Sequence, residues 1–175
     1  MRLLHQLVEH TARIQPDTVA IVDGGAKVGY AELDRAATQL GRFLLDSGAG
    51  GGGRVGIFAP RSIDAIVAML GTLKAGGVYV PLDPRTPTKR LAAMLSVCEP
   101  TCVLTTDNLA PTASSATLDL SSRPKIRSFS DIDLAAFPDE PIDASPNGHN
   151  DAYILFTSGS TGTPKAVPIG HHNVL

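Results

Sequence analysis

The stretch with the clearest chemical content is residues 153–165, which read YILFTSGSTGTPK. Its first four residues are apolar, as in a buried strand. The residues that follow can donate hydrogen bonds from hydroxyl groups and bring backbone N–H groups close to a ligand, and a cation closes the segment. Such groups at the end of a strand suit an anion with many oxygens, such as a polyphosphate. The hydroxyl residues are Thr157, Ser158, Ser160, Thr161 and Thr163, the glycines are Gly159 and Gly162, and the cation is Lys165.

Two other interpretations of this segment are weaker. A Walker loop requires Gly-Lys-Ser or Gly-Lys-Thr, whereas Lys165 follows Pro164 and precedes Ala166. A linker rich in serine and glycine rarely follows four apolar residues and closes on Pro-Lys. The segment is therefore predicted to be a phosphate-binding loop of a different kind.

Length and composition limit the class of protein. A chain of 175 residues fits one domain and can bury a core. Hydrophobic residues make up 43% of the chain and charged residues 18%, which is typical of a globular α/β domain and argues against disorder. The net charge of −2 provides no basic surface for nucleic acid or for an anionic membrane. We expect small-molecule substrates, and neither nucleic acid nor membrane as a partner.

Targeting and metal-binding signals are also weak. The sequence has no run of about 18 apolar residues and no signal-peptide core, so a cytoplasmic location is expected. Cys98 and Cys102 have no second cysteine pair to complete a metal site, and we expect both to be buried, at a helix end and a strand start. His171 and His172 are adjacent and lack a third ligand, so no metal site is predicted there either.

Hydrophobic periodicity and capping residues predict the elements that position residues 153–165. The spacing predicts helices at residues 3–14, 30–44, 63–73 and 86–98, and strands at residues 19–22, 27–28, 55–59, 78–82 and 101–105. This alternation predicts an α/β fold built from parallel βαβ units. Ligands in such folds bind beyond the carboxyl ends of the strands, where residues 157–165 would lie.

Two segments are predicted to be loops. Gly48, Gly50 and Gly53 satisfy the GxGxxG pattern of dinucleotide-binding proteins, but that motif follows a strand and opens a helix, whereas this one follows a helix and leads into a strand. Residues 106–150 are predicted to be a mostly irregular connector with one strand at residues 126–129.

Three motifs resemble those of adenylate-forming enzymes. Residues 157–165, TSGSTGTPK, are similar to the family signature TSG(S/T)TGxPKG, with Ala166 in place of the usual glycine. Residues 28–33, VGYAEL, resemble an early motif of the family. Residues 73–84, LKAGGVYVPLDP, resemble a motif of the amino-acid-activating adenylation domains of nonribosomal peptide synthetases. His171, Asn173 and Val174 match the continuation of the family signature, where a helix is expected to begin.

This resemblance implies a three-layer α/β fold, with a mostly parallel sheet flanked by helices. Residues 1–175 would form the N-terminal part of the large subdomain of an adenylation domain. By resemblance, the β- and γ-phosphates of ATP are held by Thr157, Ser158, Gly159, Ser160, Thr161, Gly162 and Lys165.

The resemblance also implies a reaction in two steps. The carboxylate of an amino acid or another acid attacks the α-phosphorus of ATP and pyrophosphate leaves. The acyl-adenylate is then transferred to the phosphopantetheine thiol of a carrier domain. Mg²⁺ is expected in the complete enzyme, with its ligands outside this chain.

The groups that hold adenine, acid and magnesium, and the catalytic lysine, are expected beyond Leu175. The chain alone is therefore expected to be inactive in adenylation, and the acid that is activated is not specified by this sequence. Two alternatives remain open. The chain could be a non-catalytic phosphate-binding module, or one half of a split adenylating enzyme.

Overall fold

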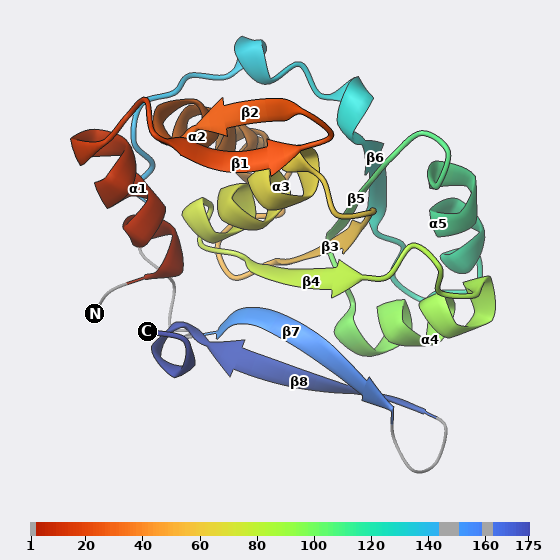
Figure 1. The fold of residues 1–175 in the computed structure, drawn as a ribbon. Coiled ribbons are helices and arrows are strands. Elements are labelled where there is room, and N and C mark those ends of the chain that lie inside the picture. The colour runs from red at the N-terminus through yellow and green to blue at the C-terminus, as the bar shows by residue number, and fades with distance from the viewer. Residues whose placement is uncertain (1–2, 144–150, 159–162) are drawn as a thin grey trace.

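The computed structural model describes residues 3–143, 151–158 and 163–175 (Figure 1). Within these residues, a six-stranded sheet has the strand order β6-β5-β3-β4-β7-β8, and a separate hairpin is formed by β1 and β2. The strands are β1 (Val19–Asp23), β2 (Ala26–Gly29), β3 (Arg54–Phe58), β4 (Val78–Leu82), β5 (Cys102–Thr105), β6 (Lys125–Ser128), β7 (Asp151–Ser158) and β8 (Pro164–Gly170). The helices are α1 (Leu4–Ile14), α2 (Tyr30–Asp46), α3 (Ile63–Lys74), α4 (Thr88–Cys98) and α5 (Ala110–Ala116).

The sheet is parallel except at one edge. Strand β3 pairs in parallel with β4 and β5, β5 pairs in parallel with β6, and β4 pairs in parallel with β7. Strand β8 is antiparallel to β7. The predicted α/β class and mostly parallel sheet are confirmed.

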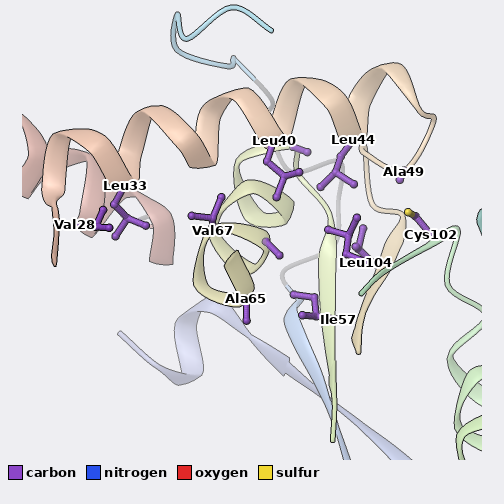
Figure 2. Packing of buried hydrophobic residues seen from close by; sticks show 13 residues of the cluster. Val28, Leu33, Leu40, Leu44, Ala49, Ile57, Ala65, Val67, Cys102 and Leu104 are labelled. Carbon is purple, nitrogen blue, oxygen red and sulfur yellow. The ribbon is translucent and has the colours of Figure 1, made fainter. Parts of the chain in front are cut away.

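Helices cover both faces of the sheet and bury two apolar clusters. One cluster joins α2 and α3 to the sheet, and Figure 2 shows Leu40 and Leu44 of α2 near Ile57 of β3 and Leu104 of β5. The second cluster joins α4 and α5 to the opposite face, with Phe58, Val80 and Val103 from the strands and Leu91 and Leu95 from α4. This arrangement gives the three layers that the resemblance implied.

Capping residues mark the start of α3 and the ends of α2 and α3 near the predicted positions. The Ser62 hydroxyl accepts a hydrogen bond from the Ala65 N–H at 3.2 Å and so begins α3. Gly48 after α2 and Gly76 after α3 have φ angles of +75° and +70°, a left-handed conformation that glycine adopts without strain. The glycine-rich segment after α2 therefore connects a helix to a strand, as expected.

The two cysteines lie where the sequence predicted. Cys98 ends α4 and Cys102 begins β5, and both are buried and free. Burial raises the pKa of Cys98 to about 12 and that of Cys102 to about 11. Both thiols are therefore protonated packing residues near neutral pH.

Two elements were missed by the sequence analysis. The expected irregular connector contains α5 as well as β6, followed by short 3₁₀ turns at Phe129–Asp131 and Leu134–Ala136. Residues Pro164–Gly170 form β8, and the helix predicted to begin at His171 is a single 3₁₀ turn, His171–Asn173. No helix of the described ranges is long and apolar enough to cross a membrane.

Helices α2 and α3 approach each other closely because glycine faces the contact. A Cβ atom on Gly71 of α3 would lie 3.0 Å from the Ala37 carbonyl oxygen and 3.0 Å from the Leu40 Cβ, both on α2. We expect Gly71→Ala to lower the free energy of unfolding by about 1 kcal/mol, because overpacking outweighs the gain in helix propensity. Urea denaturation would measure the change, with Ser96→Ala, an exposed position on α4, as the control. A Gly71→Ala variant more stable than the wild type would contradict this account of the crossing.

Candidate nucleotide-binding site

Strands β7 and β8 form an antiparallel ribbon that carries the predicted phosphate-binding residues. In the register of the ribbon, Thr157 lies opposite Lys165 and Ser158 lies opposite Pro164. Figure 1 shows the two strands, in blue, beyond β4 at one side of the molecule. The carboxyl end of β7 points in the same direction as that of β4 because the two strands are parallel. The predicted segment is therefore a hairpin that ends on the ligand-binding side of the sheet.

The two faces of this ribbon differ in burial. One face carries Ile154 and Phe156 of β7 and Ala166 of β8, which pack against the cluster under α4. The other face carries Leu155 and Val167, which are opposite each other and remain 43% and 38% exposed. The expected buried strand at residues 153–156 is therefore buried on one face only, because α4 covers one side of the ribbon and no described element covers these two side chains.

Thr157 and Lys165 lie on the exposed face, next along the ribbon from Leu155 and Val167. Directly opposed residues of an antiparallel pair have Cβ atoms about 5 Å apart on the same face. Both side chains are exposed, and Lys165 takes part in none of the ion pairs found in the described residues. A hydroxyl donor and an ammonium group are thus available to one anion.

For the other five predicted site residues, the structure does not describe the side chains. Ser158 belongs to β7 through its backbone. Gly159, Ser160, Thr161 and Gly162 lie outside the described residues. Their role in binding phosphate stays a prediction.

Ala166, which stands where the family signature has glycine, is accommodated by the strand. It pairs with Phe156 and packs against the cluster under α4. Among the described residues, Glu99 is the one non-glycine residue with a positive φ, so position 166 has no left-handed backbone that would favour glycine. The substitution therefore adds a methyl group to the core and leaves the ribbon intact.

A cleft that the sequence analysis missed lies at the carboxyl ends of β3 and β4. It has a volume of about 670 Å³, and its charged lining residues are Arg61, Asp83 and Arg85. Asp83 and Arg85 form an exposed ion pair at 2.7 Å, and the hydrogen bonds from Arg85 lower the pKa of Asp83 to about 2. The signal in the sequence is the position of these charges directly after predicted strands, on the side where α/β folds bind ligands.

The two adjacent histidines lie in different surroundings. His171 is buried and His172 is exposed. Across the described parts of the chain, no three residues among His, Cys, Asp and Glu come together in a way that could hold a metal ion. His171 instead accepts a hydrogen bond from α1, as shown below.

Comparison with known proteins identifies the class to which this fold and hairpin belong. The chain is a member of the AMP-binding enzyme family, whose family model matches residues 8–175. Within this family it is similar to nonribosomal peptide synthetases. It is 39% identical to bacitracin synthase 1 of Bacillus licheniformis over 99% of this chain, and 37% identical to tyrocidine synthase 2 of Brevibacillus parabrevis over 98%.

Solved structures agree with this assignment. The nonribosomal peptide synthetase FmoA3 superimposes with a TM-score of 0.82 and 30% identity over 97% of this chain. The N-terminal domain of FACL13 from Mycobacterium tuberculosis has a TM-score of 0.88 at 23% identity, a likeness of fold. The chain spans 3% and 5% of the two synthases, 17% of FmoA3 and 45% of the FACL13 domain. It therefore corresponds to the N-terminal part of an adenylation domain, as the sequence motifs indicated.

Proposed function

We propose that this chain supplies the triphosphate-binding part of an enzyme that activates an amino acid as its adenylate. The observation that carries the proposal is the pairing of Thr157 with Lys165 on the exposed face of the β7–β8 ribbon. Family membership of the chain supports ATP as the nucleotide.

In this proposal, the chain binds the β- and γ-phosphates. The Lys165 ammonium group forms charge-assisted hydrogen bonds to the phosphate oxygens, and the Thr157 hydroxyl donates another. The hydroxyl groups of Ser158, Ser160 and Thr161 and the backbone at Gly159 and Gly162 complete the set of donors. As the acid attacks the α-phosphorus, negative charge develops on the departing pyrophosphate, and donors already in place stabilise it. Magnesium neutralises phosphate charge in such reactions, and its ligands lie outside this chain in our proposal.

The choice of an amino acid rests on the relatives. FmoA3 has been solved with α-methyl-L-serine-AMP and matches this chain with 29% identity and a TM-score of 0.82. VinN, solved with 3-methylaspartate, matches with 26% identity and a TM-score of 0.84. The adenylate would pass to the phosphopantetheine thiol of a carrier domain in the complete enzyme.

Calorimetric titration of the full chain tests the proposal. ATP and pyrophosphate are expected to bind and to compete with each other, whereas adenosine is expected not to displace pyrophosphate, because the contacts proposed here are all to phosphate groups. A folded chain that binds neither ATP nor pyrophosphate would refute the proposal.

ATP–pyrophosphate exchange separates the proposal from its alternatives. We expect no exchange by the chain alone with any amino acid. Exchange after addition of a second polypeptide that carries the remaining motifs would establish a split enzyme. Nucleotide binding without exchange in any such mixture would instead support a non-catalytic module.

A further inference from the structure

A histidine near the end of the chain is bonded to its first helix. His171 directly follows β8 and is only 3% exposed. Its Nδ1 atom accepts a hydrogen bond at 3.1 Å from the backbone N–H of Leu4, 167 residues away in sequence. Figure 1 shows the start of α1 and the turn after β8 lying close to each other.

This bond satisfies a backbone group that the helix itself cannot satisfy. Leu4 is the first residue of α1, and the N–H groups in the first turn of a helix have no partner within the helix. The side chain of the preceding residue, Leu3, is apolar and cannot accept this hydrogen bond. A histidine nitrogen accepts only while it carries no proton, so His171 is neutral in this arrangement, with its proton on Nε2.

The surroundings of His171 connect α1 to the rest of the domain. The ring of His5 on α1 meets the His171 ring edge to face, with centroids 6.3 Å apart. On the same helix, Glu9 pairs with Lys74 of α3 at 2.6 Å, and Lys74 pairs with Asp34 of α2 at 2.9 Å. Glu9, Lys74 and Asp34 are the charged groups that act on His5 of this imidazole pair.

Burial keeps both histidines neutral. It lowers the pKa of His171, and it lowers the pKa of His5 to about 4, with Glu9 acting in the opposite direction. A histidine in the unfolded chain takes up a proton near pH 6.5, whereas the buried form resists it. The contribution of both histidines to stability is therefore complete above about pH 6.5 and is lost as the pH falls through their lowered pKa values, which for His5 is about 4.

Besides the bond at His171, the ribbon that carries Thr157 and Lys165 is held by a short ladder to β4 and by side-chain packing under α4. Strand β7 pairs with β4 at one register position, Tyr79 with Tyr153, where the two rings stack with centroids 5.2 Å apart. Strand β8 is the outer strand and packs on α4. Because the ladder between β4 and β7 is short, the orientation of the ribbon depends on this packing and on the bond from His171 at its base.

We propose that His171 is a positioning residue for the phosphate-binding ribbon: its bond to Leu4 fastens the end of β8 to α1, and a proton on Nδ1 releases the ribbon. The inference rests on the proposed function, since the ribbon matters for catalysis only if Thr157 and Lys165 bind phosphate. It assigns α1, which lies at the other end of the ribbon from these residues, a role in holding them in place.

Amide hydrogen exchange of the full chain, without nucleotide, tests the proposal. His171→Phe keeps a ring and removes the acceptor, while His171→Asn keeps an acceptor that does not titrate. We expect His171→Phe to lower the protection factors of β7, β8 and the first turn of α1 by about three- to tenfold at neutral pH, the effect of one lost hydrogen bond. His171→Asn is expected to retain them. His172→Phe, at the exposed neighbouring position, is the control and is expected to change nothing.

The pH dependence provides the second readout. Protection of β7 and β8 in the wild type is expected to fall as the pH drops below neutral, and His171→Asn is expected to make that fall smaller, the remainder being due to His5. If His171→Phe does not fold, the comparison of the wild type with His171→Asn still tests the proposal.

Two results would overturn the proposal. In the first, His171→Phe affects α1 while β7 and β8 keep their protection. In the second, His171→Asn loses protection in acid as the wild type does, which would make His5 the sensor. The hydrogen-exchange experiment contains no nucleotide, so its outcome does not depend on ATP binding. If the ribbon depends on His171 but the chain fails to bind ATP, only the proposed function is refuted.

Discussion

Replacing Lys165 with alanine is expected to weaken ATP binding by about ten- to a hundredfold, which is the usual effect of removing a charged hydrogen-bond donor. Lys165 is exposed on β8 and lies opposite Thr157, so its ammonium group can meet a phosphate without breaking an ion pair of the described residues. Because the side chain is exposed, the thermal midpoint of unfolding should stay within about 1 °C of the wild type. Calorimetric titration with ATP and with pyrophosphate would measure the loss, which should be similar for both ligands.

The chain offers a matched control for this variant. Lys27 is an exposed lysine on β2, which also belongs to a two-stranded antiparallel ribbon. Lys27→Ala removes the same charge from the same kind of backbone and is expected to leave ATP affinity unchanged. Equal losses in the two variants would show that net charge, rather than a site at Lys165, governs nucleotide binding. Lys165→Arg keeps the charge and should recover part of the affinity.

Replacing Lys74 with methionine is expected to lower the free energy of unfolding by about 2 to 3 kcal/mol. The Lys74 side chain is only 4% exposed and lies between the carboxylates of Glu9 and Asp34. Methionine keeps most of the apolar stem and removes the charge, so two carboxylates face each other without a cation. Removing one partner of a buried ion pair costs about 3 to 5 kcal/mol. The expected loss lies at or just below the lower end of this range because the two carboxylates are 31% and 28% exposed to water, which screens their charge.

Removal of the carboxylate charges should rescue this variant. The triple variant Lys74→Met, Glu9→Gln, Asp34→Asn is expected to recover more than half of the lost stability, since no unpaired charge remains. Urea denaturation of the single and triple variants would measure both effects. A triple variant as unstable as Lys74→Met would mean that lost packing, and not uncompensated charge, causes the destabilisation.

Much of this fold follows from local sequence patterns. The apolar spacing in α2, α3 and α4 and the short apolar runs of β3, β4 and β5 each specify their own element. Ser62 and the glycines after α2 and α3 mark the helix ends because they act on the backbone within a few residues. Most of these boundaries are correct to within two residues, and the motifs at residues 28–33, 73–84 and 157–165 placed the chain in its family.

The missed elements depend on distant contacts. Helix α5 has only seven residues, including serine, threonine and proline, and is held by Ala113 and Ala116 packing toward α4. Strand β8 contains Pro164 and Pro168, which argue against a strand unless it lies at an edge, where backbone donors are not all needed. The sequence does not reveal that β8 is the outer strand, because that depends on the strand order.

The candidate site, too, could be predicted only in part from the sequence. Residue types and spacing predicted the phosphate-binding segment, whereas the pairing of Thr157 with Lys165 required the register of the ribbon. The bond between His171 and Leu4 could not be predicted, since periodicity and capping patterns extend over a few residues and this contact joins the two ends of the chain.

The strand order also has a consequence for the order in which the newly made protein assembles. Strands β3 to β6 and helices α2 to α5 are complete in the chain before β7 leaves the ribosome, but the apolar cluster under α4 is completed only by Ile154, Phe156 and Ala166 of the ribbon. Strands β7 and β8 are close in sequence and pair with each other, but an isolated two-stranded hairpin is only marginally stable, so the ribbon is expected to become stable when it docks on β4. Until then β4 is an open edge, able to pair with a strand of another chain. The Leu4 N–H is synthesised long before His171, 167 residues later in the sequence, and gains this partner only when His171 arrives.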